Sequence, residues 1–80
     1  MLNPNRLEEL GFVYSLNEDN HSDETWTLGE NTMKYNRIES EKFGGILTTE
    51  TCYVYGFELI DVPTIEQIEE FVGYFNLGTL

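Results

Sequence analysis

The strongest fold signal in this chain is residues 64–75, TIEQIEEFVGYF. Thr64 is followed three residues later by Gln67, which fits a helix-capping box, and Pro63 stands just before it. Apolar residues recur at helical spacing and form one stripe: Ile65, Ile68, Phe71, Val72 and Phe75. The stretch therefore predicts an amphipathic C-terminal helix. Its opposite face carries three carboxylates: Glu66, Glu69 and Glu70.

The first residues of the chain predict a second, shorter helix. Asn3 suits the N-cap, and Pro4 suits the first helical position, where a missing N–H costs nothing. Leu2 and Leu7 stand at the positions of a hydrophobic staple. Gly11 is a residue type that commonly ends a helix, so we expect a helix of about two turns.

Between the two helices the chain alternates apolar and polar residues in the manner of β-strands. The first three strands are predicted at residues 12–16, 24–28 and 32–38, separated by a polar loop and a tight turn at 29–31. Two more are predicted at 46–48 and 51–57, with turns at 39–42 and 49–50. If the last strand stays regular, one of its faces carries Tyr53, Tyr55, Phe57 and Leu59.

This order of elements defines the expected fold class. Connections this short do not allow parallel crossovers, so the strands should pair antiparallel. We therefore expect an α+β fold in which a sheet of about four to five strands is flanked by the short N-terminal helix and the longer C-terminal helix. With 80 residues, the whole chain 1–80 should form a single domain.

The charge of the chain narrows the classes of partner. Fifteen Asp and Glu residues face only four Lys and Arg residues, which gives a formal net charge of -11. Such a charge disfavours binding to bare nucleic acid or to an anionic membrane, because phosphates would repel it. There is no signal-peptide pattern at the start and no apolar run near the ~20 residues that span a bilayer. A cytoplasmic setting is the expectation.

Few residues could support catalysis. Cys52 lies in an apolar strand-like segment and predicts a buried structural thiol, while His21 lies in a polar loop and predicts an exposed side chain. One Cys and one His are too few for a zinc site. Asn17, Asp19, Asp23 and Glu24 could offer oxygen ligands to a divalent cation, although the loop lacks EF-hand spacing. We expect no enzyme activity, no cofactor and no resident metal.

The layout resembles small acidic proteins encoded by bacteriophages and other mobile elements. The resemblance is carried by Leu-Glu-Glu-Leu-Gly-Phe at residues 7–12, a β-meander that contains Trp26, and the Thr-x-x-Gln helix start at residues 64–67. Some very small acidic phage proteins inhibit host defence, including anti-CRISPR proteins that mimic DNA. The resemblance implies an anti-defence role.

The leading hypothesis is a non-enzymatic inhibitor that binds a basic protein surface and blocks it, because complementary charge speeds and directs association. The expected contacts are carboxylates of the C-terminal helix and of the first long loop: Glu66, Glu69, Glu70, Asp19, Asp23 and Glu24. The alternative is a small structural or assembly module that forms a homo-oligomer through an exposed sheet edge or an aromatic patch.

Overall fold

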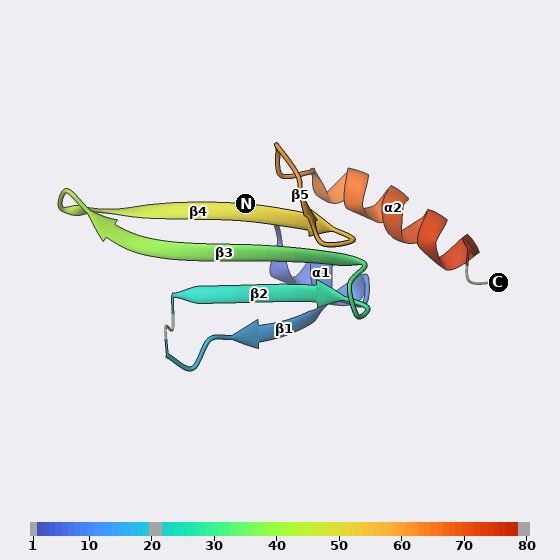
Figure 1. The fold of residues 1–80 in the computed structure, drawn as a ribbon, viewed down its shortest axis with the longest axis horizontal. Helices are drawn as coiled ribbons and strands as arrows, with labels where there is room; N and C mark the ends of the chain where they lie inside the picture. The colour runs from blue at the N-terminus through green and yellow to red at the C-terminus, as the bar shows by residue number, and fades with distance from the viewer. Residues whose placement is uncertain (1, 20–21, 79–80) are drawn as a thin grey trace.

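The structure, a computed structural model, describes residues 2–19 and 22–78, and the side chains through residue 74. Its elements in chain order are α1 (Pro4–Glu9), β1 (Val13–Leu16), β2 (Asp23–Leu28), β3 (Met33–Lys42), β4 (Gly45–Val54), β5 (Phe57–Glu58) and α2 (Ile65–Gly78). The strands form one antiparallel sheet in the order β1-β2-β3-β4-β5. This confirms the α+β class with a short first helix and a longer last helix (Figure 1).

Both helices contribute to one core on a single face of the sheet. Strand alternation turns Trp26, Tyr35 and Cys52 to the same face, where all three are buried. Leu7 of α1 and Ile68 of α2 are also fully buried and belong to the same cluster. The opposite face carries polar and partly exposed side chains, as expected of an antiparallel sheet with one solvated side.

Both helix starts follow the sequence prediction. The Asn3 side chain accepts a hydrogen bond from the Asn5 backbone N–H at 2.9 Å, and Pro4 opens α1. At α2 the capping box is complete: the Thr64 N–H donates to the Gln67 side chain at 2.9 Å, and the Gln67 N–H donates to the Thr64 hydroxyl at 3.2 Å.

The predicted turns at residues 39–42 and 49–50 are wrong. The chain turns between them, at Phe43 and Gly44, whose φ angles of 52° and 78° match the two-residue turn that suits the twist of a hairpin. Residues 39–42 belong to β3 and residues 49–50 to β4. β2 pairs with β3 only as far as Ile38, so beyond it both faces of the β3–β4 hairpin meet solvent. Polar side chains there do not signal a turn.

The predicted strand at 51–57 is also interrupted. Tyr55 and Gly56 have φ angles of 51° and 84° and form a second two-residue turn, after which β5 pairs back onto β4. The expected shared face of Tyr53, Tyr55, Phe57 and Leu59 is therefore wrong, because the chain reverses in the middle of the run. The Tyr55 ring instead meets the Phe71 ring of α2 edge-on, with 6.2 Å between the ring centroids.

The β3–β4 hairpin gives the molecule its elongated shape. Its outer part, residues 39–48, which we call the arm, has no third strand beside it and is exposed throughout. Figure 1 shows the arm projecting at the end of the molecule away from α2. The longest dimension is 49 Å, about twice each of the other two.

Candidate functional site

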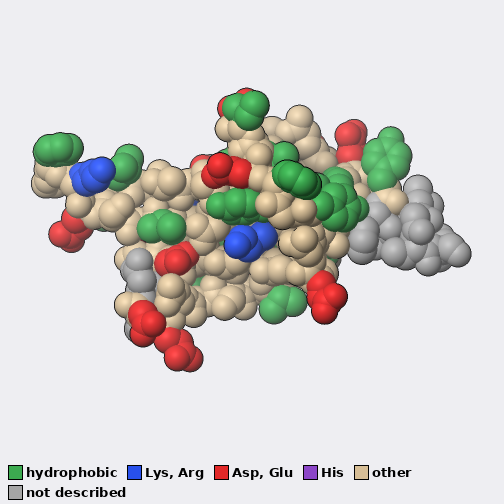
Figure 2. Space-filling model, viewed as in Figure 1, with side chains coloured by type: hydrophobic (Ala, Val, Ile, Leu, Met, Phe, Trp, Pro, Cys, Tyr) green, Lys and Arg blue, Asp and Glu red, His purple; other side chains and the backbone are tan. Residues whose placement is uncertain are grey.

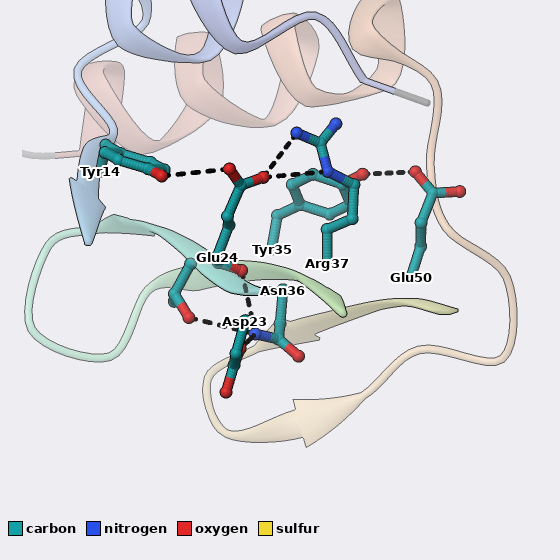
Figure 3. A network of polar contacts seen from close by, with 8 residues as sticks. Tyr14, Asp23, Glu24, Tyr35, Asn36, Arg37 and Glu50 are labelled. Atoms are coloured by element: carbon teal, nitrogen blue, oxygen red, sulfur yellow. Dashed lines mark hydrogen bonds and ion pairs between the residues drawn. The ribbon is translucent and has the colours of Figure 1, made fainter. Parts of the chain in front are cut away.

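A row of charged side chains crosses the sheet next to the core. Glu24 of β2, Arg37 of β3 and Glu50 of β4 lie directly opposite one another in the register. Each stands two residues from a core residue on the same strand, so the row shares the face of Trp26 and Tyr35. Figure 3 shows Glu24 joined to Arg37, and Glu50 joined to Tyr35.

The row is held by specific polar contacts. The Arg37 Nε and Nη2 atoms donate to one oxygen of Glu24 at 3.2 and 2.6 Å, and the Tyr14 hydroxyl donates to its other oxygen at 3.1 Å. The Tyr35 hydroxyl donates to Glu50. Burial, together with this hydrogen bond to a carboxylate, raises the pKa of Tyr35 well above its usual value.

Arg37 also covers the central aromatic residue of the core. Its guanidinium carbon lies 5.1 Å from the centroid of the Trp26 ring, which is the geometry of a cation–π contact. The Trp26 ring is tilted against those of Tyr14 and Tyr35, with centroids at 5.1 and 5.4 Å. Glu24, a predicted partner contact, therefore binds Arg37 and holds it over the Trp26 ring.

The loop carboxylates divide into a structural and an exposed group. Asp23 accepts hydrogen bonds from the side-chain amides of Asn36 at 2.6 Å and Asn17 at 3.3 Å, so it fastens the β1–β2 loop to β3. Asp19 is exposed, and its carboxylate has no partner among the described residues. Of the three predicted loop contacts, only Asp19 presents a free carboxylate to solvent.

The carboxylates of α2 divide in the same way. Glu69 pairs with Arg6 of α1, which also pairs with Glu9, so this bridge joins the two helices. Glu66 and Glu70 are exposed, one helical turn apart on the outer face. One turn further along lies Tyr74, a residue that is 74% exposed. We call Glu66, Glu70 and Tyr74 the α2 stripe.

The structure does not bring the six predicted contacts together. The β1–β2 loop that carries Asp19 and α2 lie toward opposite ends of the long axis in Figure 1. On the face seen in Figure 2, carboxylates occur at several separate places along the molecule. The negative charge is thus spread over the molecule. Among the described residues, the α2 stripe is where two free carboxylates and an exposed aromatic ring share one helix.

The few cations do little to offset the exposed carboxylates. Arg6 and Arg37 are engaged by Glu9, Glu69 and Glu24, and the Lys34 ammonium lies 4.8 Å from the centroid of the Tyr53 ring. Lys42 sits on the exposed arm, far from the α2 stripe in the fold. No described Lys or Arg side chain forms an ion pair with Glu66 or Glu70.

Cys52 lies in the core and is fully buried, which confirms the predicted structural thiol. His21 lies outside the described residues. Among those described, no three His, Cys, Asp or Glu side chains gather as a metal site would require. In the same part of the chain, neither helix combines the length and apolar character needed to cross a bilayer.

Burial of the Cys52 thiol gives a pH-dependent stability. Burial raises its pKa from an ordinary value near 9 to about 11. The contribution of the buried thiol to the free energy of unfolding is therefore complete below pH 9. This contribution is lost as the pH rises toward 11, and the loss is on the order of 2 kcal/mol. Urea unfolding between pH 8 and 11 should show a steeper decline for the natural chain than for Cys52→Val. Parallel declines would contradict the assignment.

No known protein family, curated protein or solved structure matches this chain. The likeness to small acidic phage proteins therefore stays an expectation drawn from sequence motifs.

Sequence reasoning missed two features of the site. Tyr74 was not predicted as a contact, although its place four residues after Glu70 puts it on the same outer face of a helix. The sequence gives no sign of the bridge between Arg6 and Glu69. The two residues lie 63 positions apart and meet only when both helices pack on the sheet.

Proposed function

We propose that this protein is a non-enzymatic, acidic binding protein that docks on a basic protein surface through the α2 stripe and blocks that surface. The observation that carries the proposal is the pair of unneutralised carboxylates, Glu66 and Glu70, beside the exposed ring of Tyr74. An exposed aromatic anchor flanked by charge is a common composition for a binding hot spot.

The spacing of the stripe suits a surface that normally binds phosphates. Side chains one helical turn apart have Cβ atoms roughly 5–6 Å from each other, so two carboxylates can meet neighbouring Lys or Arg residues of a groove. The Tyr74 ring can stack on a guanidinium or fill an apolar recess. The resemblance to anti-defence proteins suggests that the groove belongs to a nucleic-acid-binding enzyme of a bacterial host.

Glu69 and Glu24 take no part in this docking surface. A Lys at position 69 would face Arg6 and break the bridge between the helices, so loss of binding in such a variant would not separate docking from folding. The same holds for Glu24, which neutralises Arg37. Charge reversal at Glu66 and Glu70 leaves these internal contacts intact.

The test compares two variants with the same change in net charge. Glu66→Lys with Glu70→Lys alters the α2 stripe, and Glu18→Lys with Asp19→Lys alters the exposed β1–β2 loop. Each tagged protein is used to capture basic proteins from a bacterial lysate at low and at high salt. Each captured protein is then bound to labelled duplex DNA. Fluorescence anisotropy measures whether the added acidic protein displaces that DNA.

The natural chain should capture a basic protein at low salt and displace DNA from it, and high salt should weaken the complex. The α2 variant should lose both activities, whereas the loop variant should keep them. Equal losses in the two variants would show that only total charge matters, and retained binding in the α2 variant would remove α2 from the interface.

A further inference from the structure

The outer edge of β4 is open along most of its length. β5 pairs only with Tyr53 and Val54, and the Leu59 N–H closes the edge by donating to the Cys52 carbonyl at 2.8 Å. Since backbone groups of alternate residues in an antiparallel strand point the same way, the N–H and C=O groups of Glu50, Thr48 and Ile46 also point outward. No described strand pairs with them.

This edge lacks the features by which proteins protect an exposed strand. Residues 45–51 contain no Pro and no Lys, and their register with β3 runs without a bulge. The other edge of the sheet, β1, has only four residues and is protected by its shortness. Glu50 is the single acid along residues 45–51, and its carboxylate accepts a hydrogen bond from Tyr35.

The tip of the arm carries an exposed apolar residue in a strained conformation. Phe43 has a φ of 52°, which a bulky side chain rarely adopts, and its side chain is fully exposed. Ile46 and Leu47 beside it are exposed as well. Asn would fit the same turn without strain and without apolar exposure. Strain and apolar exposure at the same position favour a contact that a single chain does not make.

We propose that the open edge of β4 pairs with the same edge of a second copy, so that two five-stranded sheets join into one. The two strands run antiparallel about a two-fold axis at Thr48, which places Thr48 opposite Thr48 and Ile46 opposite Glu50 of the second copy. In this arrangement each outward N–H and C=O group from Ile46 to Glu50 gains a backbone partner.

The chain itself limits the register. A shift that centres the pairing on Glu50 would require Cys52, whose outward carbonyl is already bonded to Leu59. A shift that centres it on Ile46 would require Gly44, which lies in the turn. With the axis at Thr48, the Phe43 tip of each copy reaches the end of β5 in the other, beside Glu58 and Leu59.

The charge distribution favours a second copy over a basic partner at this edge. A basic partner is drawn to carboxylates, and residues 45–51 offer only one, already hydrogen-bonded. A second copy carries the same charge of -11 and is repelled wherever acids face each other, so it approaches best along the strand with fewest acids. Added salt should therefore strengthen self-association, whereas it should weaken docking of the α2 stripe. The inference does not rest on the proposed function.

Sedimentation of the full chain over a concentration series tests the pairing. The natural chain should dimerise, and more strongly at high salt. Thr48→Pro removes an outward N–H without breaking the β3–β4 ladder and should leave a folded monomer, while the matched control Thr48→Ala should still dimerise. A natural chain that stays monomeric at high salt would overturn the proposal, as would a Thr48→Pro variant that dimerises as the natural chain does.

A cross-linking experiment checks the register without relying on the proline variant. Under mild oxidation, Thr48→Cys should form a disulfide-linked dimer, because the two side chains at the axis lie opposite each other. Glu39→Cys is the matched control: it is exposed and directly opposite Thr48 on β3, but one strand further from the axis. Equal cross-linking of both variants, or none at position 48, would overturn the register.

Discussion

Replacing Ile68 by Ala should lower the free energy of unfolding by about 2–5 kcal/mol. Ile68 is fully buried and, with Val72, forms the buried contact of α2 with the core. Loss of its methyl groups leaves a cavity beneath a helix whose remaining attachments are Val72, half-buried side chains and the exposed Arg6–Glu69 bridge. Thermal unfolding followed by circular dichroism should show a midpoint lower by more than ~8 °C.

The chain offers a matched control for this prediction. Ile60 is the same residue type and is fully exposed, in the segment just before α2. Ile60→Ala should change the stability by no more than about 0.5 kcal/mol. If the two substitutions had equal effects, α2 would not be attached to the sheet through Ile68.

Replacing Arg37 by Ala should lower the free energy of unfolding by about 1–3 kcal/mol. The substitution leaves the half-buried Glu24 carboxylate without its ion pair and uncovers the Trp26 ring. Because both side chains retain some contact with solvent, the cost should stay below that of breaking a fully buried pair. Urea unfolding at neutral pH measures it.

Lys42→Ala is the control for net charge, since it also removes one cation but from the exposed arm. Its effect should be near zero. A double-mutant cycle of Arg37→Ala with Glu24→Gln should give a coupling energy of about 0.5–3 kcal/mol. A cost for Arg37→Ala no larger than for Lys42→Ala would mean that the charged row does not stabilise the core.

The parts of the fold that could be predicted are those governed by nearby residues. Asn3 and Pro4 start α1, and Thr64 with Gln67 starts α2, because a capping side chain bonds to the backbone within three residues. Strand alternation likewise predicted the strands that carry Trp26 and Tyr35, at residues 24–28 and 32–38. Each of these signals is contained in a short stretch of sequence.

The hairpin turns were misplaced because polarity is an indirect sign of a turn. The polar residues 39–42 lie in a strand that solvent reaches on both faces, so their polarity reflects exposure. The turn itself is set by Gly44, which permits the positive φ that closes the hairpin, while Phe43 adopts a positive φ under strain. The turn at Tyr55 and Gly56 follows the same rule.

For this protein, the amino-acid sequence by itself determined the helix starts, the α+β class, the burial of Cys52 and the excess of negative charge, since each follows from local spacing or composition. Only the tertiary structure decided which carboxylates remain free. Glu24, Asp23 and Glu69 are engaged by Arg37, Asn36 and Arg6, which packing brings from other elements. These partners, distant in the chain, meet only when β2 pairs with β3 and when the two helices pack on the sheet. The free stripe on α2 and the open edge of β4 therefore became apparent only in three dimensions.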